Sequence, residues 1–311
     1  MLSRTASCIY WMSRQMERAE SIARVLDVSA QMTLMPGGLA REQIMAPLEI
    51  TGMRDAFEAS GAKVTPDEII LFFALNPNNP SSIHSCLRQA RENAHVVRGK
   101  ITSEMWESLN TTWLEIQGMN RDKLKRMGVP RFLDWVKERS HLFRGATFGT
   151  LQRSDAFHFS RLGTFLERAD NTARILLVKA PDFFAERVAD TTAADYYQWA
   201  SLLRSLSAFE TYRDIYRDSI VPAQVAEMLL LRADLPRSLH ACLHEITQTL
   251  GGIQGHSGKE AKRLAAELHA RLYYGRIEEV VDEGIADYLN DFLADIYELG
   301  ARIQRAYLEA A

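Results

Sequence analysis

Apolar residues recur at helical spacing along most of the chain, and the alternation typical of strands is scarce. The longest patterns cover about residues 4–32 and 154–178. In both, apolar positions are spaced alternately by three and four residues, as helix packing requires. The positions are Ile9, Met12, Met16, Ala19, Ala23 and Leu26 in the first, and Phe159, Leu162, Leu166, Ala169, Ala173 and Leu176 in the second. The pattern predicts an all-α protein, a multi-helix bundle.

Turn-forming residues divide the rest of the chain into shorter helices. We predict helices at about residues 49–60, 83–98, 196–216, 222–231, 235–250, 258–274 and 277–308. Three more are expected: one from residue 66 to the turn-rich cluster 76–82, one that begins at a cap at Thr102 or Ser103, and one that follows the break at "RMGVPRF" and continues through residue 143. "RGATFGT" (144–150) is expected to break the chain before the helix at 154, and residues 179–197 to be irregular and exposed. No long linker is visible, so residues 1–311 are predicted to form a single domain.

The two longest helices carry the same polar residues. "QMERAESIARVL" (15–26) and "FLERADNTARIL" (165–176) align without a gap at an offset of 150. Glu17, Arg18 and Arg24 therefore recur as Glu167, Arg168 and Arg174. We infer an internal pseudo-repeat of this Glu-Arg helix, with halves of about 1–150 and 151–311.

The polar face of the repeated helix has two interpretations. It is the solvated side of an amphipathic helix with weak ion pairs, or it faces its copy. Every base in residues 4–27 is Arg, whose planar fork suits carboxylates and phosphates. We favour the second interpretation, in which the two faces enclose a pocket lined by Arg and Glu. Its walls differ, because Tyr10 and Arg14 correspond to Ser160 and Thr164.

Further polar rows supply the other candidates. Arg91 lies on a stripe of Arg and Glu in residues 88–98, and Arg204 starts a row with Ser207 and Glu210. A solvated helix edge explains each row equally well. Our candidate ligand-binding residues are Tyr10, Arg14, Glu17, Arg18, Arg24, Arg91, Glu167, Arg168, Arg174 and Arg204.

A metal site is not expected. Glu17 and Glu20 have the i, i+3 spacing found in di-iron bundles, as do Glu167 and Asp170, but no His completes either pair. Each of these acids also lies close to an Arg, which would compete with a cation.

Bulk properties exclude several classes of function. The formal net charge is −3 with no basic block, which gives no support for nucleic-acid binding. The longest apolar run, residues 69–75, is too short for a membrane span, which needs about 20 residues. Three scattered cysteines and an N-terminus unlike a signal peptide indicate a cytoplasmic protein.

Together with residues 88–110, 202–217 and 226–246, the two Glu-Arg segments resemble the alpha-E domain family, named for its α-helical fold and Glu-Arg motif. The family's pair corresponds to Glu17-Arg18 and Glu167-Arg168. Similar proteins are typically encoded beside, or fused to, a circularly permuted ATP-grasp protein, often with a transglutaminase-like protease. The resemblance therefore implies ATP-driven amide-bond formation on a peptide or amino-acid-like substrate, with ATP bound by the partner and no intrinsic cofactor.

Two functional hypotheses follow. In the first, the chain is an accessory or partner protein of an ATP-grasp amide ligase, and its pocket binds a small carboxylate, peptide or phosphate ligand, or the ligase itself. In the second, it is an enzyme on a peptide or amino-acid-like substrate. Glu17 or Glu167 would then be the catalytic general base and Arg18 or Arg168 the oxyanion stabiliser. We favour the first, because the sequence offers no evident nucleophile.

Overall fold

The computed structural model describes residues 1–32, 41–179, 193–217, 219–254 and 258–309. This part of the chain is helical throughout and has no strand, as predicted. The helices are α1 (Ser3–Met32), α2 (Arg41–Thr51), α3 (Arg54–Ala59), α4 (Pro66–Ala74), α5 (Ile83–Val96), α6 (Ser103–Ile116), α7 (Arg121–Met127), α8 (Val129–Thr150), α9 (Asp155–Lys179), α10 (Ala193–Ser205), α11 (Phe209–Tyr216), α12 (Pro222–Leu231), α13 (Leu239–Gly252), α14 (Lys259–Tyr274), α15 (Ile277–Glu283), α16 (Ile285–Ile303) and the short π-helix η2 (Gln304–Leu308).

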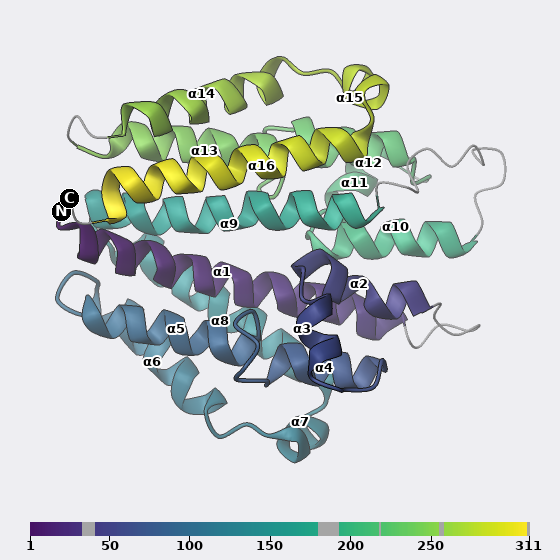
Figure 1. Cartoon of the computed structure of the whole chain (residues 1–311), viewed down its shortest axis with the longest axis horizontal. Helices are drawn as coiled ribbons and strands as arrows, with labels where there is room; N and C mark the ends of the chain where they lie inside the picture. Colours follow the sequence, from purple (N-terminus) through teal and green to yellow (C-terminus); the bar gives the residue numbers. More distant parts are fainter. Residues whose placement is uncertain (33–40, 180–192, 218, 255–257, 310–311) are drawn as a thin grey trace.

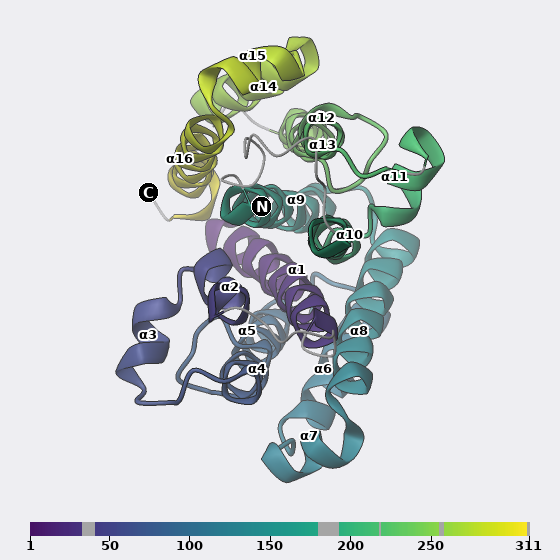
Figure 2. The same cartoon turned by 90° about the vertical axis from the view of Figure 1, so that its right-hand side faces the viewer.

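Helices α1 and α9 lie side by side at the centre of the bundle (Figures 1 and 2). On one side, α1 packs against α5 and α8, and α5 packs against α6. On the other, α9 packs against α13 and α16, and α13 packs against α14. Two short helices contact the central helix of the other half, since α10 contacts α1 and α2 contacts α9. The two sides therefore pack in a corresponding order, and the internal pseudo-repeat stays a prediction.

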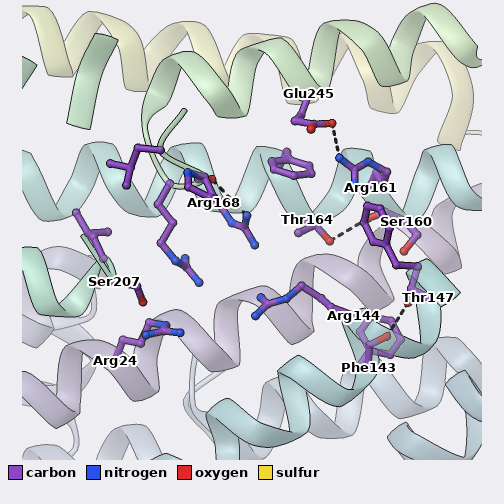
Figure 3. Close-up of a pocket in the computed structure, with 16 residues that line it drawn as sticks. Arg24, Phe143, Arg144, Thr147, Ser160, Arg161, Thr164, Arg168, Ser207 and Glu245 are labelled. Atoms are coloured by element: carbon purple, nitrogen blue, oxygen red, sulfur yellow. Dashed lines mark hydrogen bonds and ion pairs between the residues drawn. The ribbon is translucent and has the colours of Figure 1, made fainter. Parts of the chain in front are cut away.

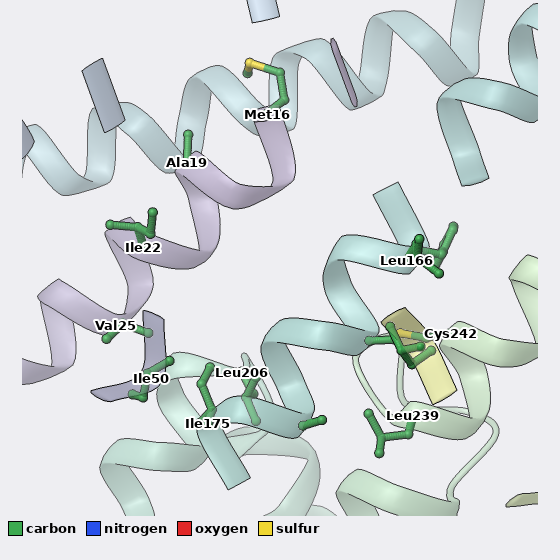
Figure 4. Packing of buried hydrophobic residues seen from close by; sticks show 14 of the residues in the cluster. Met16, Ala19, Ile22, Val25, Ile50, Leu166, Ile175, Leu206, Leu239 and Cys242 are labelled. Carbon is green, nitrogen blue, oxygen red and sulfur yellow. The ribbon is translucent and has the colours of Figure 1, made fainter. Parts of the chain in front are cut away.

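The predicted apolar stripes of α1 and α9 are buried, because both helices are surrounded by neighbours. Every residue of the two stripes is at most 3% exposed. Figure 4 shows part of this core, where Met16, Ala19 and Ile22 follow one face of α1 and Leu166 projects from α9. At the crossing of α1 and α9, a Cβ added to Gly163 would lie 2.3 Å from the carbonyl oxygen of Tyr10. A glycine is therefore required for this close approach.

Side-chain caps fix where several helices begin. Thr65, Ser82, Thr102 and Ser238 each accept a hydrogen bond from the backbone N–H three residues later, and Pro66 occupies the first turn of α4. Of the two predicted caps, Thr102 and Ser103, the cap is Thr102. Because Ser238 is the cap, α13 begins at Leu239 and not at residue 235 as predicted.

Three segments predicted as single helices are each divided in two. The divisions fall at Gly52 (φ +65°), Ser207 (φ +54°) and Gly284 (φ +97°). A positive φ interrupts a right-handed helix, and the glycines adopt it at little cost. The predicted helices at 196–216 and 277–308 are therefore α10 with α11, and α15 with α16 and η2. The predicted helix at 49–60 covers α3 and only the end of α2, which begins at Arg41.

The predicted break at "RGATFGT" is wrong, because these residues form the last turns of α8. Thr147 and Thr150 donate their hydroxyl protons to the carbonyl oxygens of Phe143 and Ala146, and the helix continues to Thr150. The chain turns instead at Leu151, which has extended backbone. Of the segment 179–197, predicted to be irregular, residues 180–192 lie outside the described part. For the described residues the prediction is wrong, because Lys179 ends α9 and α10 begins at Ala193.

Candidate functional site

The two Glu-Arg pairs meet where α1 crosses α9. Glu17 on α1 accepts hydrogen bonds from Nε and Nη2 of Arg168 on α9, at 2.8 and 2.9 Å. Glu167 on α9 accepts them from Nε and Nη2 of Arg18 on α1, at 2.6 and 3.0 Å. Each glutamate thus binds the arginine that follows the other glutamate, in the bidentate geometry that guanidinium and carboxylate favour.

These ion pairs are buried, so the interpretation of a solvated polar face is wrong. The side chains of Glu17 and Glu167 are each 2% exposed, and that of Arg168 is 9% exposed. Burial alone would raise the pKa of Glu167, but Arg18 and Arg14 outweigh it and hold the pKa at about 2. Burial likewise opposes the charge of Glu17, whose pKa is nevertheless lowered by Arg168 and Arg237. Both carboxylates are therefore ionised near neutral pH.

On one side of the crossing, Glu167 is shared by Arg14 and Arg18. Arg14 donates from Nε to Glu167 at 2.8 Å and from Nη1 to the Tyr10 hydroxyl at 3.1 Å. A small cavity of about 170 Å³ lies on this side, lined by Arg18, Glu167 and Arg174 among others. Arg174 is bound to Asp170 at 2.9 Å.

On the other side, Glu17 and Glu20 are shared by several arginines. Arg237, which precedes α13, donates from Nη1 to Glu17 at 3.0 Å and from Nη2 to Glu20 at 2.7 Å. Arg144 on α8 donates from Nη1 to Glu17 at 3.1 Å and also contacts Glu20. The Ser140 hydroxyl donates to Glu20 at 2.7 Å.

Two further arginines complete this cluster. Arg24 contacts Glu20 at 2.8 Å, and Arg168 binds Glu17 as described. Four arginines thus share two carboxylates among the residues that the structure describes. Burial lowers the pKa of Arg237, and its neighbours Glu17 and Glu20 do not fully compensate. The local charge is positive by two.

A cavity of about 450 Å³ opens over this cluster, within the size range of small-molecule sites. Figure 3 shows the Arg24, Arg144 and Arg168 side chains directed toward one another in it. Its polar wall is completed by the hydroxyls of Ser160, Thr164 and Ser207, and much of the remaining wall is apolar. The arginines that line it are Arg24, Arg144, Arg161, Arg168 and Arg237.

Thr164 contributes to the difference in size between the two cavities. It occupies the position that Arg14 holds in the first copy, and its hydroxyl donates to the Ser160 carbonyl oxygen at 3.1 Å. A short side chain here leaves space over the cluster, whereas Arg14 reaches across to Glu167. The two walls are therefore unequal, as the sequence predicts.

Most of the predicted site residues lie around the crossing. Arg24 lines the large cavity and Arg174 the small one, while Tyr10 is buried beside Arg14. Two predicted residues lie elsewhere. Arg91 donates to the side-chain oxygen of Asn110 at 3.3 Å and stacks over Trp106, and the exposed Arg204 stacks over Phe209. Neither lines the large or the small cavity.

Sequence reasoning missed Arg144, Arg161 and Arg237 as site residues. For Arg237 a signal exists, because "PRSLHACL" (236–243) matches "PSSIHSCL" (80–87), each at the start of a helix that packs on a Glu-Arg helix. Arg237 corresponds there to Ser81, and the two line the large and the small cavity respectively. Arg144 gave no signal, because its segment has the composition of a turn.

The match to known families covers residues 1–308 and is to Alpha-E, described as a predicted alpha-helical domain with a conserved ER motif. The chain belongs to the Alpha-E family. Glu17-Arg18 and Glu167-Arg168 spell this motif, and in this Alpha-E domain they form the reciprocal ion pairs between α1 and α9. No curated protein and no solved structure matches the chain.

The large cavity is lined mainly by cationic, hydroxyl and apolar side chains. Within the described ranges, no group of three or more His, Cys, Asp or Glu side chains is placed to hold a metal ion, and no helix is long and apolar enough to cross a membrane. The carboxylates of Glu17, Glu20 and Glu167 are occupied by arginines. Guanidinium groups that outnumber their carboxylates favour a carboxylate or phosphate ligand.

Proposed function

We propose that this Alpha-E domain is a binding component of an ATP-grasp amide-ligase system, and that its large cavity holds a carboxylate- or phosphate-bearing ligand of that system. The observation that carries the binding proposal is the excess of arginines over carboxylates at Glu17 and Glu20. A buried positive charge without a partner is costly, and an anion in the cavity offsets that cost. The partnership with a circularly permuted ATP-grasp protein rests on the family resemblance.

The alternative, a stand-alone enzyme, receives less support from the geometry. Glu167 with a pKa of about 2 is a weak base near neutral pH, and two arginines occupy its carboxylate. A general base works best when its pKa lies near the operating pH. Glu17 is held in the same way by Arg168, Arg237 and Arg144.

The partnership is tested by ATP consumption. A circularly permuted ATP-grasp protein from the same source organism is assayed with candidate amino acids, with and without this chain. We expect the chain to increase amino-acid-dependent ATP consumption severalfold. Equal consumption in its absence would contradict the partnership.

The role of the cavity is tested in the same assay with Thr164→Arg. Thr164 lines the cavity, so a long side chain at this position fills the space that the ligand would occupy. The added positive charge is repelled by the surrounding arginines. We expect this variant to lose the increase in ATP consumption. The matched control is Thr111→Arg, the same substitution on an exposed position of α6, which keeps the increase. Loss of the increase in both variants, or in neither, would contradict a role for the cavity.

A further inference from the structure

The large cavity has two chemically different ends. At one end lie the guanidinium groups of Arg24, Arg144, Arg168 and Arg237 over Glu17 and Glu20. At the other end lie the rings of Phe143 and Phe148, with the Arg161 guanidinium 4.7 Å from the ring centroid of Phe148. The Phe165 ring lies between the two ends, 4.7 Å from the Arg161 guanidinium and 4.9 Å from that of Arg168. Figure 3 shows Phe143 and Arg161 away from the end where Arg24 lies. One ligand that fills the cavity therefore meets both ends.

The charge at the cationic end specifies the charge of the ligand. Four arginines on two carboxylates leave an excess of two positive charges among the described residues, so a monoanion would leave one of them unbalanced. Burial lowers the pKa of Arg237, in keeping with incomplete compensation. A dianion balances the cluster, and a phosphomonoester is a dianion above its second pKa of about 6.

Hydrogen-bond donors are also available for such a group. Arg144 donates to Glu17 and Glu20 through Nη1 alone, and its Nε and Nη2 have no acceptor within the described ranges. Its side chain is 28% exposed, more than those of Arg168 and Arg237, so it lies nearest the solvent side of the cluster. A phosphoryl group has three oxygens that accept hydrogen bonds, and it can engage several guanidinium groups together.

The aromatic end specifies an apolar group beside the phosphoryl group. Phe143 and Phe165 are buried, whereas Phe148 is 51% exposed although it lines the cavity. An exposed ring at the edge of a cavity gains burial when an apolar group packs against it. The volume of about 450 Å³ accommodates a ring-sized group together with a phosphoryl group.

We propose that the ligand of this cavity is a small phosphomonoester that carries an apolar, ring-sized group. The phosphoryl group lies among Arg24, Arg144, Arg168 and Arg237, and the apolar group lies against Phe148 and Phe165. This inference rests on the proposed anion-binding function of the same cavity and narrows its ligand class.

The test is calorimetric titration of the full chain at pH 8 with four probes. Phenyl phosphate is the dianion with a ring, methyl phenyl phosphate is its monoanionic diester, benzoate is a monoanionic carboxylate, and inorganic phosphate lacks the ring. We expect phenyl phosphate to bind at least about tenfold more tightly than each of the others, which one charge-assisted hydrogen bond or one buried ring can supply. If the diester or benzoate binds as tightly as phenyl phosphate, the proposed requirement for a dianion is contradicted. If inorganic phosphate binds as tightly, the proposed requirement for an apolar group is contradicted. If none of the four binds, the proposed anion-binding function fails as well.

Two variants test the cationic end and the aromatic end of the cavity separately. Arg144→Gln removes one cation of the excess, and we expect it to reduce the preference for phenyl phosphate over its diester about tenfold. Phe148→Ala changes an exposed side chain, so the fold is retained, and we expect it to weaken phenyl phosphate severalfold while inorganic phosphate is unaffected. Arg121→Gln, at an exposed arginine bound to Glu68, is the control and leaves all four affinities unchanged. An unchanged preference in Arg144→Gln together with unchanged phenyl phosphate binding in Phe148→Ala would overturn the proposal.

Discussion

Glu167 illustrates how a single residue links the two central helices. Its carboxylate is 2% exposed and accepts hydrogen bonds from Arg14 and Arg18, both on α1. A buried carboxylate with two cations stabilises the fold only while all partners are present, because removal of one leaves the others desolvated and unpaired. The contribution of Glu167 should therefore be visible in both mutation and pH experiments.

Glu167→Gln should lower the free energy of unfolding by about 3 kcal/mol, because Arg14 and Arg18 lose their charged partner in a buried site. The matched control is Glu68→Gln, which removes the partner of Arg121 in an exposed ion pair and should cost at most about 1 kcal/mol. Urea unfolding followed by circular dichroism measures both. Equal effects of the two substitutions would contradict a structural role of the crossed pairs.

The pH dependence of stability follows from the lowered pKa of Glu167. Its pKa falls from 4.5 to about 2 in the folded protein, so the ionised form is stabilised by folding. This contribution is complete above about pH 5 and is lost as the pH falls toward 2, and it corresponds to about 3 kcal/mol. Between pH 5 and 2 the wild type should therefore lose more stability than Glu167→Gln, measured by urea unfolding at each pH. Parallel losses in the two proteins would show that the carboxylate is not held in its charged form.

At the level of the elements, the sequence predicts what depends on local pattern and misses what depends on packing. The long helices α1 and α9, the cap at Thr102 and the whole of α12 follow from periodicity and capping residues. The divisions at Gly52, Ser207 and Gly284 do not, because the apolar spacing continues across them. Ser207 has a positive φ and lines the large cavity, a conformation that the surrounding contacts maintain at the cost of local strain.

Part of the candidate site could likewise be predicted from the sequence. Glu17, Arg18, Glu167 and Arg168 are visible because the same letters recur at one spacing. That each glutamate pairs with the arginine of the other helix depends on how α1 crosses α9, which no local pattern encodes. Arg144 joins them only because α8 packs against α1, and α8 is longer than its glycines suggest. The residues of the central ion pairs could be proposed from the sequence, whereas their pairing and the excess of cations beside them could not.

The crossing of α1 and α9 itself depends on Gly163. A methyl group at this position would lie 2.3 Å from the Tyr10 carbonyl oxygen and 3.3 Å from Cγ of Arg14. Gly163→Ala should therefore separate the helices and lower the free energy of unfolding by about 1–3 kcal/mol, as overpacking does. In contrast, Gly145→Ala in α8 meets open space and should stabilise by up to about 1 kcal/mol through helix propensity. Thermal unfolding distinguishes these opposite signs, and stabilisation by Gly163→Ala would contradict the close crossing.

At the level of the whole molecule, the halves are joined by their most central contacts. Three kinds of contact join residues 1–150 to residues 151–311. They are the α1–α9 crossing, the contacts of α10 with α1 and of α2 with α9, and the ion pairs at Glu17 and Glu167. Two independent domains would instead share a smaller and more polar interface. We therefore expect the chain to unfold as one cooperative unit.

Separation of the halves tests this cooperativity. Fragments 1–150 and 151–311, divided between α8 and α9, should each fail to fold alone. Each would expose the apolar residues that face the other half. Glu17 would lose Arg168 and Arg237, and Glu20 would lose Arg237, while Arg168 and Arg237 would lose these carboxylates in a desolvated site. Co-expressed, the fragments should form a 1:1 complex with a single unfolding transition, measured by size-exclusion chromatography and circular dichroism. A stable, cooperatively folded fragment 1–150 on its own would instead establish two independent domains, and the cavity between α1, α8 and α9 would then be an interface between them.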